Sequence, residues 1–471
     1  MQVPDLIPVV PEILMTILVL SLLVIDLFIK QKEYIAVYTV VGSLLVIISV
    51  FYCTGVTFKG MFVADSYSIF FKMIFLINVI FAAIISVEYL KKRASLYGEY
   101  YVLLVFATIG MMIMASAGNL IVLYLGLELM ALSTYVLAGI IRTDGLSTEA
   151  AVKYFLLGAF SSAILLYGIS LLYGITGSLD IREIGLYIAK EGIINNKLLL
   201  LGLVFFITSF GFKIAAAPFH MWTPDVYHGA PTSITAFMSV GPKAAAFAIF
   251  GRVFMIVFPA LSGSWVNLLI PIAILTMAVG NIVALAQTNI KRMLAYSSIA
   301  HAGYALLGII AASNEGLSAM MNYMLIYLFM NVGAFILVIM LNNQAKVGDS
   351  IHDYRGLSKS NPLAAFLMLI IMFSLTGIPP TAGFMGKLYL FMAVVNAGYG
   401  WLAVVAVIFS AISAFYYLRI VMFMFMNESI EEVKLSLVDV NGLLLIIVVF
   451  MVLFIGVNPQ PFVELARLAI L

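Results

Sequence analysis

Residues 211–245 read GFKIAAAPFHMWTPDVYHGAPTSITAFMSVGPKAA, and this stretch determines the class of fold. It is apolar enough to lie in a membrane, yet it contains Lys213 and Lys243. Pro218 cannot donate a hydrogen bond to the carbonyl of Ile214 and clashes with it, so a helix should kink or break here. Broken backbone is tolerated at membrane depth only where it is buried in protein or lines a cavity. The stretch therefore predicts an interrupted transmembrane helix with a lysine beside the break.

The composition of the whole chain is that of a membrane protein. Of its 471 residues, 64% are hydrophobic and 10% are charged, whereas soluble proteins carry about 25% charged residues. The single cysteine, Cys53, excludes a disulfide framework and a cysteine-ligated iron–sulfur cluster. GFMGKLY at 383–389 lacks the rest of a Walker motif, so ATP-driven pumping by this chain alone is not expected. The net charge of +2 gives no reason to expect nucleic acid as a partner.

Apolar runs long enough to cross the hydrocarbon, about 20 residues, recur along the chain. Fourteen of them predict an all-α polytopic membrane protein with fourteen transmembrane helices. The predicted spans are 6–29, 35–54, 62–90, 99–117, 119–141, 147–175, 196–220, 229–258, 264–287, 290–312, 317–342, 361–397, 400–427 and 437–457.

The twelfth span contains a second Pro-bearing break near a lysine, Lys387. Pro379 and Pro380 free the carbonyls of Leu375 and Thr376 from helical hydrogen bonding. The two interrupted spans, the seventh and the twelfth, are five apart, and an odd offset reverses the orientation. Corresponding interruptions of this kind point to inverted repeats.

The sequence therefore predicts two inverted five-helix repeats, spans 4–8 and spans 9–13. The chain then divides into the first three helices (1–98), the first repeat (99–258), the second repeat (259–427) and a C-terminal helix (428–471).

The distribution of basic residues predicts the orientation. Loops opposite the termini carry twelve: Lys30, Lys32, Lys91, Lys92, Arg93, Arg142, Lys291, Arg292, Lys346, Arg355, Lys359 and Lys434. The terminal side carries five: Lys59, Arg182, Lys190, Lys197 and Arg467. The positive-inside rule therefore places both termini outside.

Ionisable residues at membrane depth are the candidate functional residues, because such groups are costly there unless they serve a function. At 1.5 Å per residue, Glu128 lies about 14 Å deep, Lys243 about 18 Å and Lys387 about 15 Å. Together with Lys213, these residues predict proton transfer. A neutral hydrogen-bonded glutamate and snorkelling lysines are the structural alternatives.

Two further groups are secondary candidates for proton transfer. His301 lies about 15 Å deep and titrates in a range suited to a relay, although a core histidine bonded to a backbone carbonyl is equally compatible. Lys153 is six residues inside its span and could snorkel. Other charges near the membrane are expected to face an interface or a neighbouring subunit: Glu12, Asp26, Lys72, Arg252 and Arg419. The many Met and aromatic residues are interpreted as packing.

Five stretches of the chain resemble the antiporter-like subunits of respiratory complex I, and subunit N most of all. They are NLIVLYLGLELMALSTYVL (119–137), STEAAVKYFLLGAFSSAILLYG (147–168), the stretch 211–245, QTNIKRMLAYSSIAHAGY (287–304) and GIPPTAGFMGKLYLF (377–391). The resemblance implies fourteen helices, two inverted repeats, broken helices seven and twelve, and a proton path along the membrane plane.

The resemblance also implies roles for individual residues. Glu128 matches the fifth-helix glutamate, Lys213 the seventh-helix lysine, Lys243 the relay lysine of the eighth helix and Lys387 the exit lysine of the twelfth. Lys153 and His301 lie within matched motifs as secondary relay residues.

The family's known properties extend these expectations to cofactors, partners and location. No cofactor or metal is expected in this chain; quinone, NADH, FMN and iron–sulfur clusters are expected in partner subunits. The expected partners are other membrane-arm subunits, including other antiporter-like ones, and the lipid bilayer of a bacterial inner membrane. Three alternatives stay open: a cation/proton antiporter subunit, a related complex with another electron donor, and an assembly scaffold.

Overall fold

The computed structural model describes residues 4–93, 97–193, 196–344, 349–428 and 437–470. Lys346 and Lys434, which count toward the predicted orientation, lie outside these residues. Within them, twelve helices are long and apolar enough to cross a membrane. The chain is therefore a multi-pass, all-α membrane protein, as predicted.

The twelve long helices and α8, α15 and α16 occupy the predicted apolar runs, whereas the short helices α7, α9, α14 and α19 lie in connections between or after them. The elements, in chain order, are η1 (Ile7–Val9), α1 (Val10–Phe28), α2 (Glu33–Tyr52), β1 (Gly55–Thr57), η2 (Phe58–Gly60), β2 (Phe62–Ala64), α3 (Ser66–Lys92), α4 (Gly98–Ser116), α5 (Leu120–Ala138), α6 (Gly145–Thr176), α7 (Ile181–Glu191), α8 (Lys197–Lys213), α9 (Trp222–Gly229), α10 (Thr232–Ile256), η3 (Pro259–Leu261), α11 (Ser262–Leu285), α12 (Ile290–Ile310), α13 (Asn314–Gln344), η4 (Ile351–Tyr354), α14 (Leu357–Ser360), α15 (Pro362–Thr376), α16 (Ala382–Asn396), α17 (Gly400–Met426), α18 (Val440–Val457) and α19 (Gln460–Leu468).

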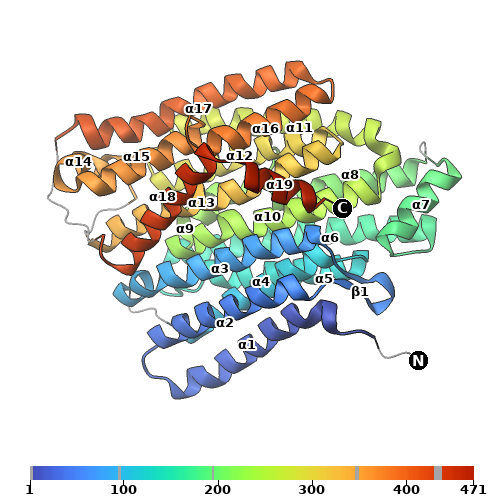
Figure 1. Ribbon diagram of the computed structural model, residues 1–471, viewed down its shortest axis with the longest axis horizontal. Coiled ribbons are helices and arrows are strands. Elements are labelled where there is room, and N and C mark those ends of the chain that lie inside the picture. The colour runs from blue at the N-terminus through green and yellow to red at the C-terminus, as the bar shows by residue number, and fades with distance from the viewer. Residues whose placement is uncertain (1–3, 94–96, 194–195, 345–348, 429–436, 471) are drawn as a thin grey trace.

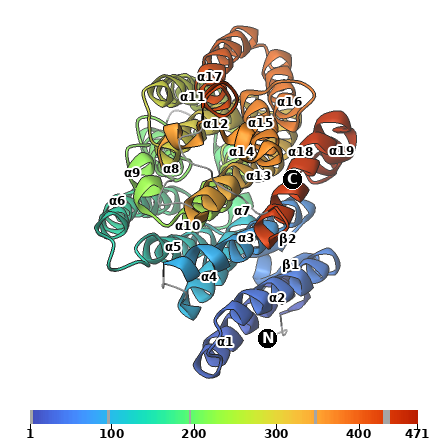
Figure 2. The ribbon, with the colours of Figure 1, turned by 90° about the vertical axis from the view of Figure 1, so that its left-hand side faces the viewer.

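The long helices run along one common direction, with the two ends of the chain at the same end of the bundle as α7 and β1 (Figure 1). Seen along the helices, α1 and α2 lie at one edge of the bundle and α17 lies at the opposite edge (Figure 2). Between them, α10 is buried along almost its whole length and packs against α3, α12 and α13. The outer helices expose large apolar side chains such as Leu27, Phe160, Phe415 and Phe450, as expected of surfaces that face lipid or other subunits.

Polar caps determine where many helices begin. Asp or Asn side chains accept hydrogen bonds from the free N–H groups in the first turns of six helices. These caps are Asp65 (α3), Asn119 (α5), Asp144 (α6), Asp180 (α7), Asn196 (α8) and Asn289 (α12).

The third predicted span begins too early. Residues 62–64 form β2, which pairs antiparallel with β1 through Val56 and Val63. The helix begins only at Ser66, where the Asp65 side chain accepts from the backbone N–H of Ser68. A strand of three apolar residues next to a helix is indistinguishable by hydropathy from the first turn of that helix.

Both Pro-bearing helices are interrupted. In the first, α8 ends at Lys213 and α9 begins at Trp222. In the second, α15 ends at Thr376 and α16 begins at Ala382. The backbone between the halves of the first is held by other helices: the N–H of Ala217, for example, donates to the Thr276 hydroxyl of α11 at 2.9 Å.

Two short backbone bridges hold the starts of helices together. Asn119, before α5, pairs antiparallel with Asp180, before α7; Asn289, before α12, pairs in the same way with Ser350, before η4. Each bridge is closed by two backbone hydrogen bonds, such as the N–H of Leu120 to the carbonyl of Leu179 at 2.9 Å.

Candidate proton-transfer site

The three lysines predicted at membrane depth are all buried. Lys213, Lys243 and Lys387 are between 2% and 6% exposed, on α8, α10 and α16 respectively. Within the described residues, none of them has a carboxylate oxygen within 4.0 Å. Their ammonium groups therefore rely on neutral oxygens and aromatic rings.

Lys213 lies at the C-terminal end of α8, opposite α5. Its Nζ is 3.5 Å from the hydroxyl of Tyr135 and 5.9 Å from the centre of that ring. Glu128 lies seven residues before Tyr135 on α5, two turns away on the same face of the helix. The Glu128 Oε1 atom is buried and has no hydrogen-bond partner among the described residues. A carboxylate and a lysine thus flank Tyr135 without forming an ion pair.

Lys243 lies in the continuous helix α10, directly after Pro242. Its Nζ donates to the carbonyl of Ser298 on α12 at 2.8 Å and is also bonded to the Ser298 hydroxyl. Pro242 leaves the carbonyl of Met238 without its helical donor, and the hydroxyl of Tyr227 donates to this carbonyl at 3.4 Å.

His301 lies one turn beyond Ser298 on α12, and both of its ring nitrogens have a hydroxyl partner. Nδ1 is 2.5 Å from the Tyr323 hydroxyl, and Nε2 is 3.1 Å from the Tyr417 hydroxyl. Tyr417 is in turn bonded to Ser297. His301 is therefore held by side-chain hydroxyl groups rather than by the backbone carbonyl of the alternative reading.

Lys387 lies beside the second break. Its Nζ donates to the carbonyls of Leu375 and Thr376, at 3.1 and 2.8 Å, and to the Ser410 hydroxyl at 2.9 Å. It also lies 4.8 Å from the centre of the Tyr304 ring. The carbonyls that Pro379 and Pro380 were predicted to free are the ones that bind Lys387. Carbonyls at a helix C-terminus carry negative partial charge and favour a cation there.

One face of α12 therefore links Lys243 to Lys387. Ser298 contacts the first lysine, Tyr304 contacts the second, and His301 lies between them. The spacing of three residues on each side of His301 places these groups on neighbouring turns of one helix face.

The tyrosines that line this face were missed when aromatic residues were interpreted as packing. Tyr323, Tyr327 and Asn331 follow at four-residue spacing on α13, and Asn331 donates to the Tyr327 hydroxyl at 3.0 Å. That polar spacing in an otherwise apolar helix was the signal in the sequence. Tyr417 offers no such local signal, because its partners are on α12.

Lys153 lies apart from the buried lysines. Its Nζ pairs with Glu149 at 2.7 Å and with Asp225 of α9 at 2.8 Å. Asp225 also binds Arg292 of α12 at 2.9 Å. The Lys153 side chain is 41% exposed, so this cluster lies at the surface and joins the first interrupted helix to α12.

The expectation that the other charges face an interface is wrong for three of them. Glu12 and Lys72 form a buried ion pair, 2.8 Å apart, between α1 and α3. The Arg252 side chain is also buried and donates to Asp65 at 2.8 Å. Sequence spacing could not reveal these pairs, because the partners are far apart along the chain.

Asp65 shows the effect of its partners on its titration. Burial alone would raise the pKa of its carboxyl group. The positive charge of Arg252, with hydrogen bonds from Arg252 and Ser68, outweighs burial and holds the pKa below its usual value. Asp65 is therefore ionised at neutral pH.

The other two charges singled out by sequence also have partners within the chain. Asp26 binds Lys32 at 2.5 Å near the end of α1. Arg419 donates to the carbonyls of Leu285 and Gln287, at the C-terminal end of α11 and just after it, at 2.9 and 2.6 Å. Within the described residues, no group of three or more His, Cys, Asp or Glu side chains could hold a metal ion.

Comparison with known proteins identifies the family. Residues 117–413 match the family model described as NADH:quinone oxidoreductase/Mrp antiporter, transmembrane. The chain is 47% identical over 429 residues to NADH-quinone oxidoreductase subunit N of Trichlorobacter lovleyi, which covers 90% of this chain and 88% of the relative. It is 43% identical over 481 residues to the subunit N of Nitrosomonas europaea, covering 99% and 98%.

A solved structure is similar over the same length. One chain of respiratory complex I from Thermus thermophilus with bound aureothin has a TM-score of 0.82 and 32% identity. The match covers 97% of this chain and 99% of that one. The resemblance predicted from the five sequence motifs is thus confirmed, and the chain belongs to the NADH:quinone oxidoreductase/Mrp antiporter family of transmembrane proteins.

Proposed function

We propose that this chain is a proton-translocating membrane subunit of an NADH:quinone oxidoreductase. The observation that supports this function best is the series of buried lysines, Lys213, Lys243 and Lys387, none of which has an ion-pair partner among the described residues. Burial favours the neutral form of an amine, and a nearby carboxylate favours the charged form. Movement of Glu128 relative to Lys213 therefore loads or releases a proton.

The proton then passes along the middle of the membrane. Water carries it from Lys213 to Lys243, and the hydroxyl and imidazole groups on α12 carry it toward Lys387. His301, between two tyrosine hydroxyls, is the intermediate carrier, since one ring nitrogen can accept a proton while the other donates. Lys153 is a secondary carrier at the surface end of the first interrupted helix.

The proposed architecture has fourteen crossings and two inverted repeats, spans 4–8 and 9–13. The twelve long apolar helices support this count if α8–α9 and α15–α16 are taken as two further, interrupted spans. The backbone bridges support the repeats, because Asn119 and Asn289 precede the fifth and tenth spans. Asp180 and Ser350 precede the seventh and twelfth in the same way. The spans joined by the second bridge therefore come five spans after those joined by the first, which is the offset that inversion requires.

The chain would act within a larger complex. Its proposed partners are other membrane-arm subunits in a bacterial inner membrane, with both termini on the outer side. NADH, FMN, iron–sulfur clusters and quinone belong to partner subunits, and their redox chemistry shifts the protonation equilibria of the lysines through charge and conformational coupling.

The direct test replaces Lys213 and Glu128 separately by alanine in the assembled complex. Each substitution should abolish most proton translocation per electron, measured by quenching of a pH-sensitive dye in sealed vesicles. Lys197→Ala and Glu191→Ala are matched controls, because both residues are exposed near the ends of α8 and α7. Normal coupling in both Lys213→Ala and Glu128→Ala would overturn the proposal.

A second candidate, a cation/proton antiporter subunit, is favoured by the family description, which includes Mrp antiporters. Sodium-dependent proton flux by the purified complex, without NADH oxidation, would identify it. A complex with a different electron donor would be identified by mass spectrometry of the subunits that copurify. A scaffold role predicts normal pumping after every lysine substitution.

A further inference from the structure

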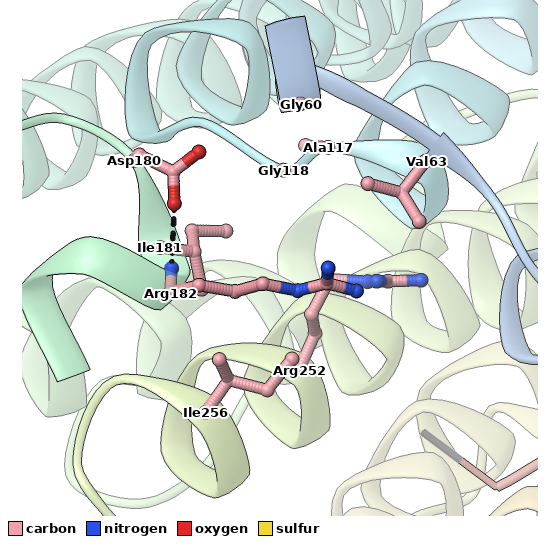
Figure 3. Close-up of a pocket in the computed structure, with 9 residues that line it drawn as sticks. All are labelled: Gly60, Val63, Ala117, Gly118, Asp180, Ile181, Arg182, Arg252 and Ile256. Carbon is pink, nitrogen blue, oxygen red and sulfur yellow. Dashed lines mark hydrogen bonds between the residues drawn. The ribbon is translucent and has the colours of Figure 1, made fainter. Parts of the chain in front are cut away.

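A cavity of about 80 Å³ lies at the end of the bundle that carries both termini. Its walls are the loop between β1 and β2, the connection from α4 to α5, the first turn of α7 and the last turns of α10 (Figure 3). Lys213, Lys243 and Lys387 do not line it, so a ligand bound there takes no part in the proposed proton path.

Arg252 forms the inner wall of this cavity. Its side chain is 3% exposed, and one of its terminal nitrogens donates to Asp65. The buried Nε has no acceptor among the described residues. A buried donor without an acceptor is destabilising, so an acceptor that enters the cavity would relieve a cost already present in the fold.

Arg182 brings a second guanidinium to the same cavity. It lies in the first turn of α7, and Figure 3 shows its side chain extending toward that of Arg252. Within the described part of the chain, no ion pair involves the Arg182 side chain. Two guanidinium groups that face one space repel each other unless an anion lies between them.

The two nearby carboxylates, of which Asp180 lines the cavity, already accept hydrogen bonds through their Oδ1 atoms. Asp180 caps α7, where its Oδ1 accepts from the N–H groups of Arg182 and Glu183. Asp65 caps α3 through Ser68 while it binds Arg252.

We propose that this cavity binds a phosphate-class oxyanion between Arg182 and Arg252. The source is either the phosphodiester headgroup of a phospholipid or free inorganic phosphate. Guanidinium groups match phosphate geometry and bind it through paired hydrogen bonds. Asp65 pairs with Arg252 but not with Arg182, and an oxyanion between the two arginines supplies acceptor oxygens to both. The ends of the transmembrane helices are also where lipid headgroups meet basic side chains.

The test measures hydrogen exchange in the α7 region, residues 178–193, of the whole complex in phospholipid-depleted detergent. Three compounds are titrated: sodium phosphate, dioctanoyl phosphatidylglycerol and dioctanoylglycerol, which lacks phosphate. Both phosphate compounds should protect the region, and dioctanoylglycerol should not. A headgroup site requires about tenfold less phosphatidylglycerol than phosphate, whereas equal potency identifies free phosphate.

Arg182→Gln is the decisive variant, because Arg182 is exposed and its replacement leaves the Arg252–Asp65 pair in place. In this variant, the concentration of each phosphate compound that gives half-maximal protection should rise about tenfold. Lys190→Gln, an exposed charge at the other end of α7, should leave protection unchanged. Protection by neither phosphate compound, or equal protection in Arg182→Gln and the unmodified chain, overturns the proposal. Loss of neighbouring subunits from Arg182→Gln with unchanged phosphate protection also overturns it, in favour of a partner carboxylate.

Discussion

At the scale of single residues, the two lysines beside the breaks have the same kind of electrostatic environment, although they lie on different helices. Lys213 is the last residue of α8, and Lys387 binds the last carbonyls of α15. Each positive charge therefore lies at the negative end of an interrupted helix. The breaks supply these lysines with dipoles instead of carboxylates, which stabilises an ammonium without fixing it in an ion pair.

The Tyr417 hydroxyl is predicted to matter for turnover as well as for stability. Tyr417→Phe removes a partner of His301 and of Ser297, whereas Tyr416→Phe removes a hydrogen bond to Asn281 and no direct partner of His301. Each change should destabilise the chain by about 1 kcal/mol. Proton translocation in vesicles should fall several-fold only in Tyr417→Phe. Equal pumping by the two variants would remove Tyr417 from the proposed path.

The buried pair of Glu12 and Lys72 leads to a stability prediction. Lys72→Met leaves an uncompensated carboxylate between α1 and α3 and should destabilise their packing by about 3–5 kcal/mol. The double variant Glu12→Gln/Lys72→Met should recover most of that loss, because no charge is then left buried. The thermal unfolding midpoint of the complex and the amount of chain in the membrane measure both effects. A double variant as unstable as Lys72→Met would contradict this account.

At the scale of elements, the sequence predicted most of the helices and both breaks, since apolar length and proline chemistry are local properties. Contacts between elements were beyond its reach. The third predicted span includes β2 as the start of its helix. The expectation that Lys72 faces an interface is wrong because its partner, Glu12, lies 60 residues away in the sequence. Within the site, the sequence located the lysines in apolar helices, but it could not reveal the hydroxyl groups that bind His301.

The second interrupted helix depends on one close approach of its two halves. A Cβ at Gly383 would lie 1.8 Å from the carbonyl oxygen of Ser374, so alanine there must push α15 and α16 apart. Gly383→Ala should therefore displace the carbonyls that hold Lys387 and strongly reduce pumping. Gly400→Ala, at the start of α17, meets nothing within 4 Å and should behave as the unmodified chain. Dye quenching in vesicles distinguishes the two, and equal pumping would show that the approach is dispensable.

At the scale of the whole molecule, the two ends of the bundle can be told apart by the connections gathered there. The α7 region lies at the end that carries both termini, and α14 lies at the opposite end (Figure 1). The excess of basic residues at the latter end predicts that it faces the cytoplasm.

Cysteine labelling tests this orientation. In a Cys53→Ser background, Lys190→Cys on α7 should react with a membrane-impermeant maleimide added outside intact cells. Lys359→Cys on α14 should react only after the membrane is opened. Both lysines are exposed, so neither site is hidden by protein. The reverse pattern would place the termini inside.

The two backbone bridges also restrict how the interrupted helices can move. Each ties down the segment that leads into one of them, and the two ties hold opposite faces of the bundle. α7 lies between Asp180 and α8, and α14 lies between Ser350 and α15, so each bridge fixes the approach to an interrupted helix rather than the helix itself. An axial shift of either interrupted helix must therefore be absorbed by its short connecting helix, at one end of the bundle for α8 and at the opposite end for α15.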